Sequence, residues 1–445
     1  MLLNDSTLAN PSITRAVRNL GPGALTESNL SAHVWPLFDR VRRRLLVRPG
    51  DSVGSQVEIY LANHSLGRPL DQVAVDVQIA LDLWYEHLDA AWSHPRGWLA
   101  AIRCFRQQVA DLLGAASYQS VVPKTSAGQG LRAVLNALSD HGHVPTIVTT
   151  RGEFDSCDVI LKTYVQKGRA KVRWVEPDTR EPIDTYSVQS LIAALDSRVD
   201  LVLCSQVLFA TGQVLAGIPD LVAAAHQVGA KVMVDTYHSF GVLPLEWEGS
   251  NPHSLGGADF LIGGSYKYTR GGPGACWLAI HPRHLDSQGD TARLTTLDTG
   301  WFAKDEPFAY QRPDPPLMAE GGDGWLESTP PVLTAYQANS GLQLLREMGV
   351  GRLRDYNLRQ QQQLCAAMRS VGVEMYEPDD WELRGAFALL PHPRATEVSR
   401  RLLQLGLNTD ARNGSVRFGP DLLTTQIEME AAARIVQQAL SESLE

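Results

Sequence analysis

The residues best suited to chemistry are an acid, a histidine and a lysine that follow apolar stretches of the chain. Asp235 ends the run VMVD, His238 comes three residues later, and Lys267 follows FLIGG within GGSYKYTRGGPG. A buried carboxylate can keep a pyridine nitrogen protonated, and a lysine amine can attack a carbonyl carbon and move a proton. Together these residue types indicate a site for an electron-withdrawing pyridine cofactor, as in the chemistry of pyridoxal 5′-phosphate (PLP).

Each of these residues also has a simpler explanation. Asp235 suits the N-cap of a helix that follows a strand, His238 can be a hydrogen-bonded core histidine, and a lysine in a glycine-rich turn is usually solvated. Lys267 does not look like a solvated loop lysine, because it stands between Tyr266 and Tyr268 just after an apolar run. The chain also has only seven lysines. The cofactor interpretation therefore depends on the three residues occurring together.

Strands that end at one edge of a sheet would bring these residues together, and short apolar runs predict such strands. We expect strands at 147–150, 172–175, 201–205, 232–235, 260–263 and 275–280, and helices at 99–113, 131–138, 188–195 and 218–228. This alternation predicts an α/β fold with a mostly parallel sheet flanked by helices. Such sheets bind ligands at the carboxyl ends of their strands, where Ser205 also falls.

The chain divides into four parts, because its 445 residues are too many for one ordinary core. Residues 1–54 are expected to form an N-terminal arm and residues 55–304 a large cofactor-binding α/β domain. Residues 305–330 are rich in Pro, Gly and Asp and are expected to connect the domains. Residues 331–445 predict two long helices and a short α+β unit, which is a smaller C-terminal domain.

The segment PKTSAGQGL is a turn of small residues that opens a predicted helix. Free backbone N–H groups and the helix dipole at Ser126 and Ala127 favour a bound anion such as a phosphate. The alternative is a plain capped helix start without a ligand.

Composition and charge argue against several classes of protein. A formal net charge of -9 disfavours a nucleic acid as the main partner, because a phosphate backbone needs a clustered cationic face. The five cysteines are widely spaced and form no CxxC pair, so we expect neither a disulfide framework nor a metal site. Neither a signal-peptide pattern nor an apolar run of roughly 18 residues occurs, so we expect a cytoplasmic protein without a membrane partner.

Two segments, VDTYHSFGVLPL and ADFLIGGSYKYTRGGPG, carry the strongest likeness to a known family. They resemble the kynureninases, a family within the class-V aminotransferases, and the resemblance covers about residues 55–440. Others follow in the family's order: EIYLANHSLGRPL, WYEHLDAAWSHPRGWLAAIRCFRQQVADLLGA, CSQVLFATGQVLAGIPDLVAAAHQVGAKV, LDTGWF, WLESTPPVLTAYQANSGLQLL and NGSVRFGPDLLTT. The resemblance implies PLP as the cofactor and the aspartate-aminotransferase-like fold of PLP-dependent transferases.

The resemblance also implies roles for individual residues in binding the cofactor. Lys267 would bind PLP covalently, Asp235 would pair with the ring nitrogen, and Tyr266 would act as an acid–base partner, directly or through a water. The further cofactor contacts that it implies are His238 and Ser205 at the ring and its phenolate oxygen, Phe154 and Ser156 at the ring face, and Ser126, Ala127, Tyr266 and Trp301 at the phosphate. Phe154 and Trp301 have an alternative as core aromatics.

The substrate side of the implied site departs from the family's pattern. Arg417 matches the arginine whose fork suits an α-carboxylate, with a surface arginine as the alternative, and His94 loosely matches a substrate-side histidine. Thr329 stands where kynureninases carry an asparagine that contacts the substrate, and a hydroxyl cannot offer an amide's paired donor and acceptor. Cys157 replaces an acid, and Ala127 replaces a threonine.

The leading hypothesis is a homodimeric PLP enzyme that acts on an L-α-amino acid by kynureninase-type hydrolytic Cβ–Cγ cleavage. The alternative is another PLP reaction on the same fold in a biosynthetic pathway, namely that of a β-lyase, desulfurase, decarboxylase or aminotransferase. A catalytically silent protein used for binding or regulation is disfavoured by the joint presence of Lys267, Asp235, Tyr266 and Arg417.

The assignment of Lys267 predicts the outcome of a labelling experiment. Borohydride reduction of the native protein fixes the cofactor to its lysine, and we expect peptide mapping to find the label on Lys267. A labelled peptide centred on Lys124 would contradict the assignment.

Overall fold

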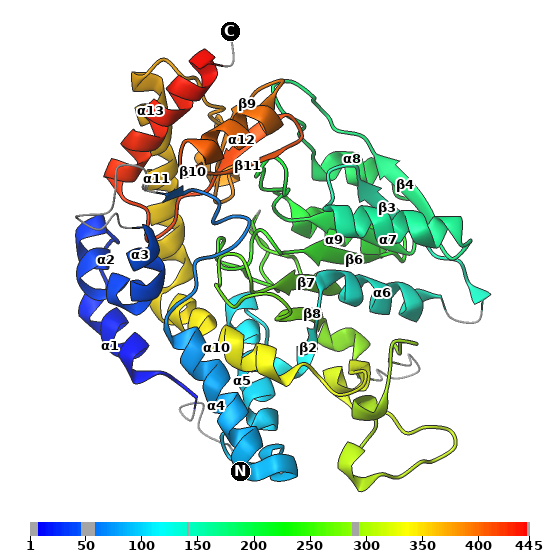
Figure 1. Ribbon diagram of the computed structural model, residues 1–445. Helices are drawn as coiled ribbons and strands as arrows, with labels where there is room; N and C mark the ends of the chain where they lie inside the picture. The colour runs from blue at the N-terminus through cyan, green and yellow to red at the C-terminus, as the bar shows by residue number, and fades with distance from the viewer. Residues whose placement is uncertain (1–7, 46–57, 140–141, 252, 287–292, 443–445) are drawn as a thin grey trace.

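A seven-stranded sheet is the frame of the large domain in the computed structural model, which describes residues 8–45, 58–139, 142–251, 253–286 and 293–442 (Figure 1). Its strand order is β2-β8-β7-β6-β5-β3-β4; β8 pairs antiparallel with both β2 and β7, and the other neighbouring strands pair in parallel. The strands are β2 (Val121–Lys124), β3 (Thr146–Thr150), β4 (Lys171–Val175), β5 (Leu201–Ser205), β6 (Lys231–Asp235), β7 (Phe260–Gly264) and β8 (Cys276–Ile280). The predicted mostly parallel α/β sheet is confirmed.

The apolar runs of the central strands follow from burial on both faces of the sheet. Successive side chains of a strand point to opposite faces. In β5, Val202 and Cys204 belong to one hydrophobic cluster, whereas Leu201 and Leu203 belong to the cluster on the other face. In β5 and β6 the polar residues are therefore confined to the strand ends.

Helices cover both faces of the sheet (Figure 1). The large-domain helices are α4 (Gln72–His87), α5 (Trp98–Leu113), α6 (Ala127–Leu138), α7 (Asp155–Gln166), α8 (Val188–Ala193), α9 (Ile218–Gln227) and α10 (Val332–Met348). Phe105 of α5, Leu221 of α9 and Leu342 of α10 join the first cluster. Leu131 of α6 and Leu161 of α7 join the second cluster.

A smaller α+β domain follows, as the sequence predicted. Its elements are α11 (Val350–Ser370), β9 (Ala388–Pro391), α12 (Ala395–Gln404), β10 (Leu407–Asn408), β11 (Asp410–Arg412), β12 (Ser415–Phe418) and α13 (Gln426–Glu442). The order β11-β12-β9 forms an antiparallel sheet, whose Val416 packs with Leu364 of α11 and Val436 of α13.

Two elements pack across the predicted domain bounds. β1 (Ile59–Tyr60) pairs in parallel with β10, so this segment joins the small domain although it precedes the large one. Helix α10 packs against α5 through the large-domain cluster because its apolar face, which includes Ala338, points to that side. The predicted bound between residues 54 and 55 lies outside the described residues.

The predicted arm is a packed helical layer. It contains α1 (Pro11–Leu20), α2 (Glu27–His33) and α3 (Asp39–Leu45). Ile13, Leu30 and Phe38 share a hydrophobic cluster with Leu344 of α10 and Tyr356 of α11.

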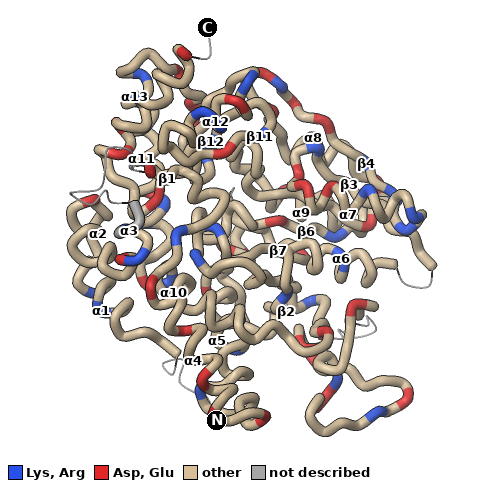
Figure 2. The backbone as a smooth tube through the Cα atoms, in the orientation of Figure 1, with Lys and Arg blue, Asp and Glu red and all other residues tan. Residues whose placement is uncertain are grey.

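The first part of segment 305–330 projects from the body as a loop, drawn in yellow-green in Figure 1, whereas Trp325 and Leu326 near its end pack into the second hydrophobic cluster. Among the described residues, the short 3-10 turns are η2 (Trp35–Phe38), η3 (Leu88–Ala91), η4 (Tyr118–Ser120), η6 (Pro282–His284), η7 (Trp301–Ala303), η8 (Pro307–Ala309), η9 (Gly321–Trp325) and η10 (Trp381–Leu383). Acidic and basic residues are interspersed along the outer elements (Figure 2). Within the described ranges, none of the helices has the length and apolar character that a bilayer crossing requires.

Candidate active site

A cavity of about 610 Å³ opens at the carboxyl ends of the central strands, a size typical of small-molecule sites. The predicted residues that line it are Ser126, Ala127, Phe154, Ser156, Ser205, Asp235, His238, Tyr266 and Lys267. A larger hollow of about 1010 Å³ beside segment 305–330 contains none of the predicted residues. The chemistry of the lining, and not its size, therefore identifies the candidate site.

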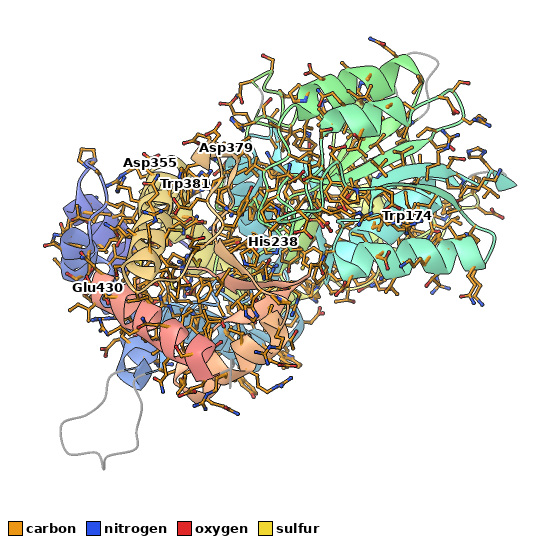
Figure 3. All side chains as sticks on the ribbon, turned by 90° about the horizontal axis from the view of Figure 1, so that it is seen from above. Trp174, His238, Asp355, Asp379, Trp381 and Glu430 are labelled. Atoms are coloured by element: carbon orange, nitrogen blue, oxygen red, sulfur yellow. The ribbon has the colours of Figure 1, made fainter. Side chains whose placement is uncertain are left out.

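The register of the sheet places the polar residues side by side. Ser205 and Asp235 are the last residues of β5 and β6 and are direct partners across the two strands. Lys267 follows β7 by three residues, and β7 pairs with β6 on its other side. His238, in the turn after β6, lies at the junction of the large and small domains (Figure 3).

Aromatic rings enclose the amine of Lys267. Its Nζ lies 5.3 Å from the ring centre of Tyr237 and 5.8 Å from those of Phe154 and Tyr266. It also makes a short contact with Nε2 of His238. These neighbours hold the amine inside the cavity and away from bulk water.

This burial changes the charge state of the lysine. Burial, with the positive charge of Arg417 as a second cause, lowers the pKa of Lys267 to about 7. Burial also lowers the pKa of His238 well below its ordinary value. A large share of the Lys267 side chain is therefore a neutral amine near pH 7, the form that acts as a nucleophile or base.

Asp235 does not cap a helix, which rules out the simpler explanation for this residue. It ends β6 and its Oδ1 accepts a hydrogen bond of 2.8 Å from the backbone N–H of Tyr237 in a turn. Burial raises its pKa to about 6, although that hydrogen bond and the charge of Lys267 act in the opposite direction. A buried carboxyl with this pKa favours a cationic partner, such as a protonated ring nitrogen.

Glu153 is a buried carboxyl of the site that sequence reasoning missed. Its Oε2 accepts a hydrogen bond of 2.6 Å from Ser205 Oγ, and its Oε1 accepts one of 2.7 Å from Thr150 Oγ1. Burial raises the pKa of Glu153 to about 7, and the neighbouring Asp235 adds to the rise. Its position between a buried strand and Phe154 was the available signal, but a glutamate there resembles an ordinary turn residue.

The phosphate turn and the aromatic face also lie on the cavity wall. Ser126 is the N-cap of α6, and its Oγ accepts a hydrogen bond of 3.1 Å from the backbone N–H of Gln129. Phe154 is 37% exposed and packs edge-on against Phe209, with ring centres 5.2 Å apart. Phe154 is therefore a wall residue of the cavity and not a core aromatic.

Arg417 is buried, with 3% of its surface exposed, so the surface-arginine alternative is wrong. Its Nε donates to Asp410 Oδ1 at 2.7 Å, its Nη2 donates to Asp410 Oδ2, and its Nη1 donates to the carbonyl of Phe209. Asp410 also bonds His64 Nε2 and accepts from Ser65 Oγ, each at 2.7 Å. Three of the five N–H groups of Arg417 are thus used, and one remains on each Nη nitrogen.

Four predicted residues are not among those that line this cavity within a single chain. Arg417 contacts its wall through Phe209, a lining residue whose carbonyl accepts a hydrogen bond from Arg417 Nη1. His94 stacks on His87, with ring centres 4.7 Å apart. Trp301 donates its indole N–H to Thr329 Oγ1 at 3.3 Å. The structure therefore brings Trp301 and Thr329 together, but it does not bring either of them, or His94, to the wall around Lys267.

The donor set fits PLP. Asp235 suits the ring nitrogen, Lys267 suits the aldehyde carbon, and the exposed face of Phe154 suits the ring. The N-terminus of α6 at Ser126 suits the phosphate. These groups all face one cavity.

Comparisons with known proteins give the family to which this chain is similar. A family model described as aminotransferase class-V matches residues 79–393. The kynureninase of Deinococcus radiodurans is 27% identical over 372 residues, covering 81% of this chain and 84% of that protein. The kynureninase of Pseudomonas fluorescens is 26% identical over 396 residues, covering 86% and 89%.

Solved structures of low sequence identity share the fold. A cysteine desulfurase from Escherichia coli superposes with a TM-score of 0.73 at 15% identity, covering 94% of this chain and 100% of that one. A cysteine desulfurase from Thermococcus onnurineus gives a TM-score of 0.69 at 19% identity, covering 89% and 99%. The expected fold of PLP-dependent transferases is confirmed.

The raised pKa of Glu153 predicts a pH-dependent effect on stability. Between about pH 4.5 and pH 7 the unfolded chain loses this proton while the folded chain keeps it, so the free energy of unfolding falls as the pH rises. Glu153→Gln removes the ionisation. In the cofactor-stripped protein it should raise the free energy of unfolding at pH 8 by on the order of 2–3 kcal/mol.

Urea unfolding at pH 5 and pH 8 measures this effect. The gain should nearly vanish at pH 5, where wild-type Glu153 is itself protonated. The exposed Glu374→Gln variant is the matched control and should show no such difference. A Glu153→Gln variant that is less stable than wild type at pH 8 would show that the carboxylate stabilises the fold.

Proposed function

The chain belongs to the class-V aminotransferase family, and we propose that it catalyses kynureninase-type hydrolytic Cβ–Cγ cleavage of an L-α-amino acid with a γ-carbonyl group. PLP is the cofactor, and when bound it withdraws electrons from the substrate carbons. The observation that carries the proposal is the convergence of Lys267 and Asp235 in one cavity, within a chain that matches kynureninases over more than four-fifths of its length.

Lys267 is the group that moves the α-proton. Its lowered pKa of about 7 lets the amine accept a proton and release it again near neutral pH. His238 fixes the amine through Nε2 and is itself held by a contact of 3.1 Å between its Nδ1 and the Tyr268 hydroxyl. This chain of contacts orients the lysine within the cavity.

Tyr266 is the acid–base partner at the γ-carbonyl. It lines the cavity, and burial raises its pKa above the ordinary tyrosine value, so the phenol keeps its proton at neutral pH. A protonated hydroxyl can donate to the carbonyl oxygen while water attacks the carbon, or it can orient that water. The products would be L-alanine and a carboxylic acid.

Arg417 binds the α-carboxylate through its two remaining N–H groups, one on each Nη nitrogen. A carboxylate accepts such a pair in a bidentate geometry. Asp410 is the positioning residue, because it holds the opposite edge of the guanidinium and is fixed by His64 and Ser65.

Another PLP reaction on the same fold is the second candidate, and the altered residues Thr329 and Cys157 favour it. The desulfurase version has less support. Sulfur transfer to a protein requires an accessible thiolate, whereas Cys157 is buried and burial raises its pKa well above the usual value. Burial also raises the pKa of Cys276, which lines the cavity.

The protein acts as a homodimer in this proposal. One chain places Trp301, Thr329 and His94 away from its own cavity, although the family resemblance gives them roles in the site. A second copy can supply them. This arrangement would make each site a product of two chains.

Light scattering at assay concentration should therefore give about twice the chain mass of 48.8 kDa.

A complementation test shows whether Trp301 of one chain acts in the site of the other. Lys267→Ala and Trp301→Ala are each expected to lower activity, and a mixture allowed to exchange subunits should recover it, because one site of each mixed dimer has both native residues. A fully active monomer, or a dimer without recovery, would contradict the shared site.

The threonine at position 329 predicts a low kcat/KM for kynurenine. A site that lacks one polar contact loses about 1 kcal/mol or more of recognition. We expect weak release of L-alanine from L-kynurenine by the native enzyme, and Thr329→Asn should raise kcat/KM for kynurenine by about 10-fold. A panel with 3-hydroxykynurenine and other amino acids should identify a better substrate.

Arg417→Ala is the control for this measurement. It should lower kcat/KM for every α-amino acid alike, by about 100-fold, because the lost hydrogen bonds are charged. Robust kynurenine hydrolysis that is insensitive to changes at Thr329 would show that this position does not set specificity. An effect of Arg417 on one side chain alone would place it at the substrate's far end.

A further inference from the structure

We infer that Arg132 binds the phosphate group of the cofactor and supplies the positive charge for it. This inference rests on PLP as the cofactor of the proposed function, but not on which reaction the enzyme catalyses. Arg132 had no role in the sequence analysis, because an arginine in an amphipathic helix is usually solvated.

The position of Arg132 brings its guanidinium to the phosphate turn. It belongs to α6, five residues after Ala127, and it lines the same cavity as Lys267 and Ser126. Its Nη1 lies 3.7 Å, and Ser126 Oγ 3.9 Å, from the point where a Cβ on Gly128 would be. The guanidinium and the capping hydroxyl therefore flank the first turn of α6.

Gly128 keeps this part of the wall open. A Cβ there would come within 2.8 Å of Cδ1 of Ile160, so a larger residue would push into the cavity wall. Without a side chain at this position, the first N–H groups of α6 and the Arg132 guanidinium can face the same anion.

The charge of a phosphate monoester is balanced most fully by a cation beside the helix N-terminus. Such a group carries roughly −1.5 to −2 at pH 7, whereas the other implied contacts, from Ser126, Ala127, Tyr266 and Trp301, are neutral. Among the described residues that line the cavity, the lysine and arginine side chains are Lys267 and Arg132. His238 also lines it, but burial lowers the pKa of this histidine well below its ordinary value and favours the neutral ring. Lys267 is committed to the aldehyde end of the cofactor, which leaves Arg132 for the phosphate.

The other nearby cation, Lys124, is already paired, and Arg132 has no competing carboxylate among the described residues. Lys124, close in sequence to the turn, donates to Glu327 Oε1 at 2.8 Å and to the Trp325 carbonyl at 3.1 Å. Within the described ranges, no carboxylate lies within ion-pair distance of Arg132. A guanidinium can offer two parallel N–H groups to phosphate oxygens, which makes the binding strong and directional.

The test compares two ligands that differ only in the phosphate. Cofactor-stripped full-length protein is titrated with PLP and with pyridoxal, and binding is followed by the absorbance of the ligand. The variants are Arg132→Gln, which removes the charge but keeps a good helix former, and Arg132→Lys, which keeps the charge but not the fork. Arg103→Ala removes the same charge from an exposed position of α5, outside this cavity, and is the matched control.

Arg132→Gln should weaken PLP by about 10- to 100-fold, as expected for lost charged hydrogen bonds, and should leave pyridoxal affinity unchanged. Arg132→Lys should restore part of the PLP affinity, and Arg103→Ala should change neither ligand. Inorganic phosphate should compete with PLP more weakly in Arg132→Gln than in wild type.

A change in PLP affinity of less than about threefold in Arg132→Gln would overturn the inference. Equal weakening of PLP and pyridoxal would also overturn it, because the effect would then be on the fold of the cavity. These readouts need no substrate, so a failure of the proposed Cβ–Cγ cleavage does not affect them. If Arg132→Gln fails to fold, Arg132→Lys decides the question, because loss of the fork should weaken PLP by more than about threefold and leave pyridoxal affinity unchanged. An unchanged PLP affinity, or equal weakening of both ligands, would overturn the inference.

Discussion

Burial of ionisable groups at the ends of the central strands is the constraint on which the site depends. The sheet is apolar on both faces, so Asp235 and Lys267 can occupy only the ends of strands, where they still lose most of their hydration. Burial therefore favours the neutral form of both groups: it raises the pKa of Asp235 to about 6 and lowers the pKa of Lys267 to about 7. The same burial that makes these charges costly gives the lysine a usable amine and the acid an affinity for a cationic ring.

Three parts of the chain meet at this point and hold the lysine loop in place. The backbone N–H of Gly67 donates to the Tyr266 carbonyl at 3.0 Å, and a Cβ on Gly67 would lie 1.8 Å from the Lys267 carbonyl oxygen. Only glycine permits this approach. Arg68 and Arg270, on either side of the contact, both pair with the buried Asp421 of the small domain. The cavity is therefore fixed by the N-terminal segment, the sheet and the small domain together.

The sequence predicted the cofactor side of this arrangement because apolar periodicity identifies strands, and strand ends identify polar residues with one common location. Glu153 was missed because its hydrogen-bond partners give no signal in the sequence. Ser205 is far from it along the chain, and Thr150 is an ordinary residue at the end of a strand. Strand β2 was missed because it is a short edge strand that contains Pro123, a residue that weakens a strand pattern. The relation of Trp301 and Thr329 to the cavity depends on tertiary geometry and, in the proposed homodimer, on the second chain, neither of which a local pattern encodes.

The Arg417–Asp410 pair explains how a buried guanidinium can be held in one orientation before any substrate binds. An unpaired buried guanidinium would be strongly destabilising, and the cross-strand register of β11 and β12 places Asp410 directly opposite it. The pair is neutral overall, so in the proposed function Arg417 would attract an incoming carboxylate mainly through the direction of its two remaining N–H groups and less through net charge. Recognition of the α-carboxylate by direction suits catalysis, because it fixes the orientation of the Cα–H bond relative to the amine of Lys267. Residues at the far end of the substrate are then left to determine which amino acid is cleaved.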